Sequence, residues 1–255
     1  MRVLFTICGR AGSKGIKNKN IRNFNGIPLP YYTISAIDLF LKKTTLDVEA
    51  DVVVNTDSTE LRELCLNNKL LDVATIDRGM ELAGDDVGKI AVINDCLKKM
   101  EDRNGYAYDV VLDLDITSPL RTISDIQRLI EKHICTGADV TTSVTSARRN
   151  PFFNQLKKTE NGYKKVIDSN FTARQQAPEI FDMNASMYAY TPAFLRSGKG
   201  VLDGYCECID MYDTGILDLD HEGDFELMEV IASYLYSTKE HFKEIRDNIC
   251  MIGRQ

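Results

Sequence analysis

The chain opens with Val3–Cys8 (VLFTIC), and Gly9–Asn20 (GRAGSKGIKNKN) follows directly. The first run is apolar apart from one threonine, as is typical of a short buried β-strand. The second has three glycines at intervals of three, and their small size lets backbone N–H groups approach a ligand closely. A loop that follows a strand lies at the carboxyl edge of a parallel sheet, where open α/β folds bind ligands. Together the two segments predict an α/β fold with an anion-binding loop after its first strand.

The spacing of the glycines sets this loop apart from the common nucleotide-binding fingerprints. It fits neither G-x-x-x-x-G-K-[ST] nor G-x-G-x-x-G, because two residues separate each glycine from the next. Arg10, Lys14 and Lys19 can add charge-assisted hydrogen bonds to phosphate oxygens. From these residues alone, a simple surface turn remains the alternative to a phosphate site.

Charge is distributed unevenly along the chain. Of 255 residues, 31 are basic and 38 are acidic, which gives a net charge of −7. Residues 1–37 contain six basic side chains and no acidic one, so the remainder of the chain carries −13. A basic segment in an acidic protein favours a compact anionic ligand over nucleic acid, because nucleic-acid-binding proteins are more often basic overall. A basic surface edge without a ligand is the alternative.

The composition is that of an ordinary globular protein, with 44% hydrophobic and 27% charged residues. No apolar run approaches the roughly 20 residues of a membrane span, and we recognise no signal peptide, so we expect a cytoplasmic protein. The seven cysteines include no C-x-x-C pair. We therefore expect them to be reduced and not to bind zinc.

Strand-like and helix-like patterns alternate after the loop. The expected strands are Asp51–Asn55, Asp109–Leu114, Asp139–Val144 and Asp213–Leu219. Apolar residues recur at helical spacing in residues 93–100, 126–134 and 224–236. Thr122 and Asp125 fit a capping box at the start of the second helix. In the last helix, the residues expected to face inward are Leu227, Met228, Ile231 and Leu235. The alternation predicts a Rossmann-like, doubly wound, mostly parallel sheet.

Residues 146–190 interrupt this alternation. They contain a turn signal at Asn161-Gly162 and read as hairpins and long loops. We expect a single domain over residues 1–255 that carries a β-rich insertion at about residues 146–190. The insertion is expected to supply substrate contacts and a dimer interface.

Five motifs follow one another along the chain: Arg10–Asn20, Asn55-Thr56-Asp57, Arg78–Asp85, Thr117–Arg121 and Asp218–Asp220. Together they resemble the motifs of the sugar-activating cytidylyltransferases, the CMP-sialic acid synthetase group. Ala147–Asn154 and Asn170–Pro178 look most similar to the CMP-legionaminic acid synthetases of bacteria.

This resemblance implies that the protein transfers CMP from CTP to a nine-carbon 2-keto sugar acid and releases pyrophosphate. It implies a homodimer and a Mg²⁺ cofactor, for which Mn²⁺ could substitute. The implied nucleotide-binding residues are Arg10, Gly12, Ser13, Lys14, Lys19, Asn20 and Arg78. The implied sugar-binding residues are Asp115, Arg174, Gln175, Asn184 and Tyr188. Asp218 and Asp220 would bind the metal, and the implied catalytic set is Arg10, Lys14, Asp218 and Asp220.

Two positions in the expected sugar region differ from the sialic-acid-using relatives. This chain has Asp115 where those relatives typically carry Gln, and Asp182 where they carry Arg. The differences leave the nucleotide-binding motifs intact. They favour legionaminic acid over N-acetylneuraminic acid as the substrate.

Two other functions are compatible with parts of the sequence. Asp113-Leu114-Asp115 is an Asp-x-Asp of the kind that holds a metal-bound diphosphate in nucleotide-sugar glycosyltransferases. The chain could also be a nucleotide-binding regulator without catalysis. The basic loop argues against the first function, and the retention of both metal-binding aspartates with Arg10 and Lys14 argues against the second.

Overall fold

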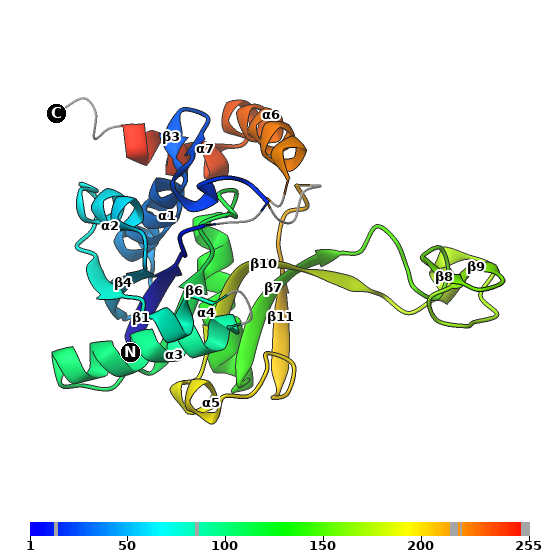
Figure 1. Ribbon diagram of the computed structural model, residues 1–255, viewed down its shortest axis with the longest axis horizontal. Coiled ribbons are helices and arrows are strands. Elements are labelled where there is room, and N and C mark those ends of the chain that lie inside the picture. Colours follow the sequence, from blue (N-terminus) through cyan, green and yellow to red (C-terminus); the bar gives the residue numbers. More distant parts are fainter. Residues whose placement is uncertain (13–14, 85–86, 215–218, 220, 251–255) are drawn as a thin grey trace.

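A seven-stranded sheet forms the centre of the described part of the protein (Figure 1). The computed structural model describes residues 1–12, 15–84, 87–214, 219 and 221–250. In sheet order the strands are β11 (Cys206–Asp210), β7 (Val140–Ser146), β10 (Phe181–Tyr190), β6 (Val110–Leu114), β1 (Arg2–Cys8), β4 (Glu49–Thr56) and β5 (Ala74–Asp77). All neighbouring pairs are parallel except those of β10, which runs antiparallel to both β6 and β7. The predicted Rossmann-like, mostly parallel sheet is confirmed.

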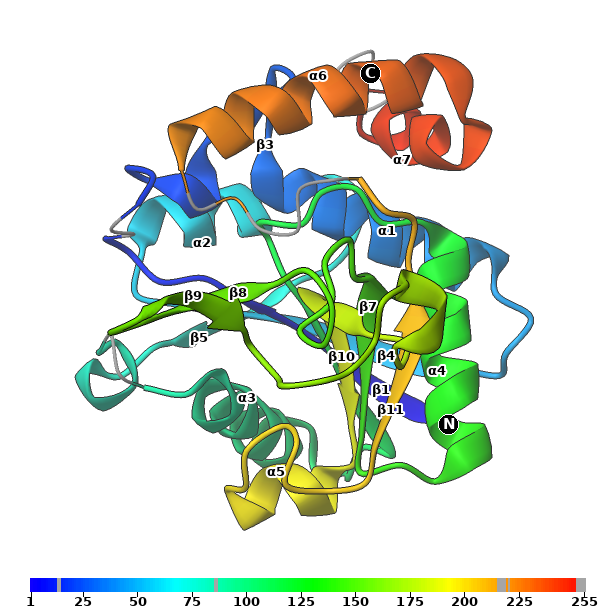
Figure 2. The same cartoon turned by 90° about the vertical axis from the view of Figure 1, so that its right-hand side faces the viewer.

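Helices cover both faces of this sheet (Figure 2). One face carries α1 (Leu29–Lys43), α2 (Thr59–Leu66) and α4 (Ile123–Thr136). Outside α1 lie α6 (Glu222–Thr238) and α7 (Glu240–Cys250). The other face carries α3 (Lys89–Asn104) and the short α5 (Pro192–Ser197). The chain therefore forms three layers, with α6 and α7 added outside the first.

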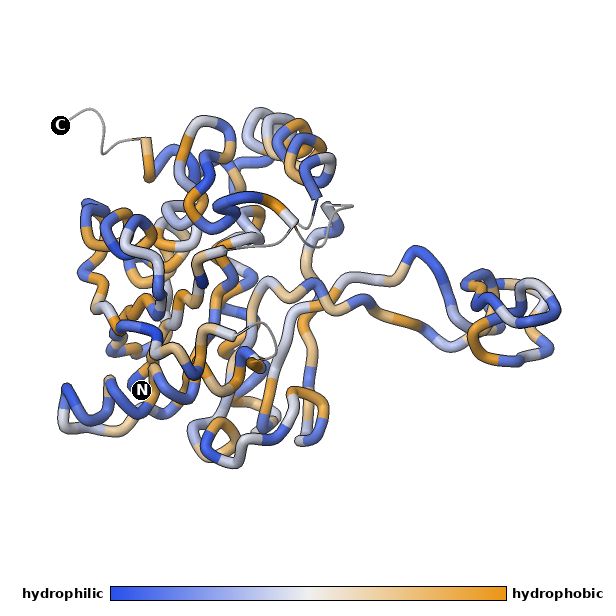
Figure 3. Tube along the Cα trace, viewed as in Figure 1, coloured by the Kyte–Doolittle hydropathy of each residue, from blue (hydrophilic) through white to orange (hydrophobic). Residues whose placement is uncertain are grey.

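The first strand shows why its sequence is apolar almost throughout. Phe5 and Ile7 pack into the core beneath α1, whereas Leu4 packs into the core beneath α3. Successive side chains of a strand point to opposite faces, so a strand covered by helices on both sides needs apolar residues at every position. On the outer helices, by contrast, hydrophobic and hydrophilic segments are interspersed along the chain, as Figure 3 shows for α6.

The remaining elements are short. They are the 3₁₀ helices Lys19–Ile21, Met80–Leu82 and Arg174–Gln176, the paired strands β2 (Asn23–Phe24) and β3 (Ile27–Pro28), and the hairpin β8 (Leu156–Thr159) and β9 (Gly162–Lys165). Gly162 has a φ of +93° at the hairpin turn, a conformation that favours glycine. The turn predicted at Asn161-Gly162 is therefore confirmed.

Residues 147–180 form an arm that projects from the sheet, with the β8–β9 hairpin at its tip (Figure 1). The arm corresponds to the larger part of the insertion expected at residues 146–190. The last ten residues of that range differ from the expectation, because β10 inserts between β6 and β7 in the central sheet. Two neighbouring strands satisfy its backbone hydrogen-bonding groups, and Met187 and Ala189 are fully buried.

The end of the chain also differs in part from the sequence-based expectation. Asp213, Thr214 and Leu219 are in no strand, and the rest of the strand expected at 213–219 lies outside the described residues. The strand at this edge of the sheet is β11, which pairs with β7. The expected helix is confirmed as α6, but Leu227 is 55% exposed, because the buried stripe runs through Phe225, Met228, Ala232 and Leu235.

The predicted capping box of α4 is confirmed. The Thr122 Oγ1 accepts a hydrogen bond from the Asp125 backbone N–H (3.2 Å), and the Asp125 carboxylate accepts one from the Thr122 backbone N–H (2.9 Å). We expect Thr122→Ala to lower the free energy of unfolding by about 1 kcal/mol, because the Asp125 backbone N–H in the first turn of α4 loses its side-chain acceptor. Urea unfolding measures the change. Gln127→Ala on the exposed face of the same helix is the control, and an equal loss in both variants would contradict the assignment.

Candidate active site

The glycine-rich loop leaves the end of β1 beside the end of β4. The Gly9 backbone N–H donates to the Asn55 carbonyl (3.2 Å), and the Ala11 backbone N–H donates to the Asp57 carboxylate (2.7 Å). Asn20 closes the loop, because its side-chain amide donates to the Arg10 carbonyl (3.0 Å). The Asn55-Thr56-Asp57 motif therefore supports the backbone of the loop.

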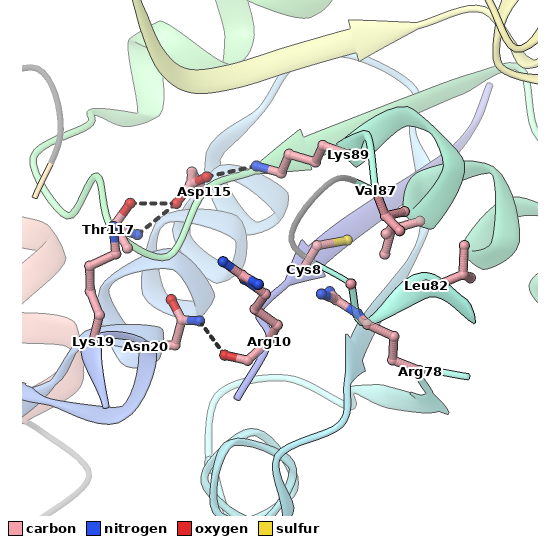
Figure 4. Close-up of a pocket in the computed structure, with 13 residues that line it drawn as sticks. Cys8, Arg10, Lys19, Asn20, Arg78, Leu82, Val87, Lys89, Asp115 and Thr117 are labelled. Carbon is pink, nitrogen blue, oxygen red and sulfur yellow. Dashed lines mark hydrogen bonds and ion pairs between the residues drawn. The ribbon is translucent and has the colours of Figure 1, made fainter. Parts of the chain in front are cut away.

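A pocket of about 230 Å³ opens at this carboxyl edge of the sheet (Figure 4). Its lining includes Arg10, Lys19 and Asn20 from the loop, Arg78 from the end of β5 and Asp115 from the end of β6. Four of the predicted nucleotide-binding residues and one predicted sugar-binding residue are thus brought together. Gly12 lines an adjoining pocket that also contains Arg10 and Asn20. Ser13 and Lys14 lie outside the described residues.

Arg78 is held in place by the buried end of β4. Its Nε donates to the Asn55 Oδ1 (2.9 Å), and its Nη2 donates to the Asn55 carbonyl (3.0 Å). Asn55 is fully buried, and its amide donates in turn to Asp95 on α3 (3.2 Å). A guanidinium fixed at two points presents its remaining N–H groups in a defined direction, which suits recognition of an anionic or polar ligand.

Lys89 also lines the pocket, although it belongs to none of the sequence motifs. It is the first residue of α3, and its ammonium lies 2.7 Å from both the Asp113 Oδ2 and the Asp115 Oδ2. Burial opposes the charge on Lys89, but the two carboxylates raise its pKa well above the usual value. Burial also favours the neutral form of Asp115, yet Lys89 and Thr117 lower the pKa of that carboxyl to about 2. The pocket therefore contains a charged ammonium–carboxylate cluster.

One signal in the sequence does point to this cluster. Asp113 interrupts the otherwise apolar strand β6, and its side chain is fully buried in the structure. A buried carboxylate requires a partner. The Thr6 hydroxyl supplies one hydrogen bond (2.9 Å), and Lys89 supplies the charge. Sequence alone did not reveal the partner, because Lys89 is 24 residues away on another element.

The Thr117–Arg121 motif forms the turn that holds Asp115. The Thr117 backbone N–H and hydroxyl both donate to the Asp115 Oδ1, at 2.8 and 2.7 Å. Arg121 is almost completely buried and donates to Thr33, to the Asp115 carbonyl and to the Ser186 carbonyl. Arg121 thus joins the end of β6 to β10, and this role is structural.

The remaining predicted sugar-binding residues fall in different places. Tyr188 lies on β10 opposite Asp113, and its ring centre is 6.0 Å from the Lys89 Nζ. Asn184 is buried and accepts a hydrogen bond from Ser143 (2.5 Å). Arg174 and Gln175 line a separate pocket at the base of the arm, where Arg174 donates to the Ala147 carbonyl (2.9 Å). Within one chain, Arg174 and Gln175 therefore do not line the pocket that contains Arg10.

The predicted metal ligands Asp218 and Asp220 lie outside the described residues. Among the residues that the structure does describe, no group of three or more His, Cys, Asp or Glu side chains could hold a metal ion. In the same part of the chain, we find no helix with the length and apolar character needed to cross a membrane.

Known proteins are similar to this chain in fold and in sequence. The structure of CMP:2-keto-3-deoxy-manno-octonic acid synthetase in complex with CTP covers 92% of the chain with a TM-score of 0.63, at 14% identity and over 99% of its own length. At that identity the likeness concerns the fold alone.

Two curated relatives are similar over nearly the whole chain. The post-translational flagellin modification protein B of Campylobacter coli is 33% identical and covers 90% of this chain and 94% of its own length. The CMP-N,N'-diacetyllegionaminic acid synthase of Campylobacter jejuni is 32% identical and covers 91% of this chain and 95% of its own length. The cytidylyltransferase family model matches residues 4–244. The chain therefore belongs to the cytidylyltransferase family and is a nucleotidyltransferase.

Proposed function

We propose that this protein transfers CMP from CTP to a nine-carbon 2-keto sugar acid, with legionaminic acid as the preferred acceptor and pyrophosphate as the second product. The observation that carries the proposal is the pocket at the carboxyl edge of the sheet, where Arg10, Lys19 and Arg78 converge. Their charge suits a triphosphate. The similarity to a CMP-N,N'-diacetyllegionaminic acid synthase supports the acceptor.

The reaction needs no nucleophile from the protein. In our proposal the anomeric 2-hydroxyl of the sugar acid attacks the α-phosphorus of CTP, and the bond to the bridging oxygen of pyrophosphate breaks. Catalysis then consists of holding both substrates in line and neutralising the phosphate charge. Arg10, Lys14 and Lys19 are proposed to bind the triphosphate, with Gly12 and Ser13 supplying backbone contacts. Asn20 and Arg78 are proposed to place the nucleotide.

Mg²⁺ is the proposed cofactor, and Mn²⁺ is expected to substitute for it. Asp218 and Asp220 offer the hard carboxylate oxygens that such ions prefer. When bound, the ion would neutralise part of the negative charge of the triphosphate. Asp220 is also proposed to accept the proton of the sugar hydroxyl.

The sugar is proposed to bind next to Asp115 and Tyr188, whose side chains both lie near the Lys89 ammonium. Arg174 and Gln175 belong to the arm, and Asn184 belongs to the first half of β10.

The arm exposes several large apolar residues, namely Leu156, Tyr163, Val166 and Ile167. We propose that a second copy of the chain covers them and that the protein is a homodimer, because exposed apolar clusters mark interaction surfaces.

The two rival functions receive less support. A glycosyltransferase of the Asp-x-Asp type needs Asp113 and Asp115 for a metal ion, whereas here Lys89 lies between the two carboxylates. A non-catalytic regulator is opposed by the relatives that are named as enzymes.

All seven cysteines lie in the described part of the chain and are free thiols. That state suits the reducing cytoplasm, where we place the reaction.

Arg10→Ala tests the phosphate-binding role of the loop. We expect kcat/KM to fall roughly 10²–10³-fold, because loss of a charged contact to the transition state costs on the order of 2–4 kcal/mol. Lys17→Ala is the matched control, since Lys17 is an exposed basic residue of the same loop that does not line the pocket. Release of pyrophosphate measures both variants. A folded Arg10→Ala enzyme with activity within a few-fold of wild type would refute the assignment.

The metal assignment is tested by comparing the two Asp-x-Asp pairs. We expect Asp218→Asn and Asp220→Asn each to abolish most Mg²⁺-dependent turnover, because an amide oxygen carries no net charge for the ion. Asp115→Asn should leave the Mg²⁺ concentration for half-maximal rate unchanged. Rates measured across a Mg²⁺ titration decide between them. If only Asp115→Asn raised the Mg²⁺ requirement, the glycosyltransferase function would gain support.

A panel of legionaminic, N-acetylneuraminic and pseudaminic acids with CTP tests the acceptor. We expect legionaminic acid to have the highest kcat/KM, because an ionised carboxylate at Asp115 only accepts hydrogen bonds, whereas Gln also donates them. Asp115→Gln should narrow the difference between legionaminic and N-acetylneuraminic acid. Equal or better turnover of N-acetylneuraminic acid by the wild-type enzyme would reject the sugar assignment and leave CMP transfer intact.

A further inference from the structure

Lys89 occupies an unusual position for a lysine. It is the first residue of α3, where the helix dipole places a partial positive charge. An ammonium at a helix N-terminus is disfavoured unless negative charge compensates it. Here two carboxylates do so, since the Asp113 Oδ2 and the Asp115 Oδ2 each lie 2.7 Å from the Lys89 Nζ. The three side chains form one charged cluster, and none of them is among the residues proposed to bind the nucleotide.

The two carboxylates converge because of their spacing. Asp113 is in β6, and Asp115, two residues further along the chain, directly follows the last residue of that strand. Residues i and i+2 of a strand point to the same side, so both carboxylates face one point. Hard divalent cations bind at such a point between carboxylate oxygens. In this chain the Lys89 ammonium fills it.

The cluster also leaves little freedom to Asp115. Its Oδ1 accepts hydrogen bonds from the Thr117 backbone N–H and hydroxyl, and its Oδ2 accepts one from Lys89. An ionised carboxylate has about four acceptor positions, so about one remains for a ligand. The side chain of Asp115 is 23% exposed toward the pocket, whereas that of Asp113 is fully buried. Asp113 therefore anchors Lys89, and Asp115 is the member that a ligand can reach.

We propose that Lys89 is a built-in cation that takes the place of a divalent metal between Asp113 and Asp115, and that it positions the Asp115 carboxylate for the sugar acid. The first part needs no assumption about the substrate. The second part rests on the proposed function. The Asp113-Leu114-Asp115 sequence is then an Asp-x-Asp that works without metal, and the metal used in the reaction binds elsewhere.

Mn²⁺ binding to the protein without nucleotide or sugar tests the first part. Electron paramagnetic resonance of free Mn²⁺ counts the bound ions. We expect Lys89→Met to bind one more Mn²⁺ per chain than wild type, and the gain to disappear in Lys89→Met/Asp115→Asn. Lys89→Arg keeps the cation and should bind as wild type does. A folded Lys89→Met variant with wild-type stoichiometry overturns the proposal.

Lys42→Met is the matched control, because Lys42 also pairs with a buried aspartate, Asp38, at 2.7 Å, but on α1 and away from the pocket lining. It should gain no Mn²⁺. If Lys89→Met is unfolded without metal, the proposal expects added Mn²⁺ to restore its folding, as followed by circular dichroism. Failure of Mn²⁺ to do so contradicts the proposal.

A double-mutant cycle in steady-state kinetics tests the positioning role. Lys89→Met and Asp115→Asn should each lower kcat/KM for the sugar acid on the order of 10- to 100-fold, and the double variant should be no worse than either, because the residues act as one unit. Lys89→Arg should recover most of the loss. If the losses in kcat/KM of the two single variants instead add up in the double variant, the positioning role of Lys89 is refuted. Absence of turnover in the wild type would instead refute the proposed function and leave the Mn²⁺ result standing.

Discussion

Parallel pairing of β1 with β4 on one side and with β6 on the other brings the carboxyl ends of these three strands side by side. The register sets Cys8 beside Asn55, so the glycine loop begins next to the Asn55-Thr56-Asp57 motif. Asp115 emerges from β6 at the same edge, and Arg78 emerges from β5 beyond β4. The pocket residues that follow these strands depend on this arrangement, since antiparallel neighbours would send alternate strand ends to opposite edges of the sheet.

Several polar residues of the sequence motifs have a supporting role in the structure. Asn55 fixes the guanidinium of Arg78, Asp57 holds the backbone of the loop, and Arg121 ties the turn after β6 to β10. Asn55 and Arg121 are buried, where an unmade hydrogen bond is costly, whereas Asp57 is exposed just after β4. Satisfying these groups also orients the side chains that face the ligand. The same residues therefore stabilise the edge of the sheet and prepare the pocket.

Opposite charges in the pocket are balanced within the chain. Arg10, Lys19 and Arg78 give the loop side of the pocket a positive character that attracts phosphate. On the other side, Lys89 compensates Asp113 and Asp115, which would otherwise repel two anionic substrates. The arm adds a second, separate pocket that contains Arg174 and Gln175. The proposed homodimer would offer a physical way to use both pockets, because the arm extends beyond the body of its own chain (Figure 1).

The sequence by itself determined the strands around the loop, the Thr122–Asp125 capping box and the basic loop itself, because these features depend on residues two to four positions apart. The motifs also indicated that Arg10, Lys19, Asn20 and Arg78 would lie together, since a parallel sheet brings its loops to one edge. Only the tertiary structure decided that β10 enters the central sheet and that Lys89 pairs with the aspartates of β6. Those contacts join residues 24 or more positions apart, and the burial that makes a charge require a partner exists only once the helices have packed against the sheet.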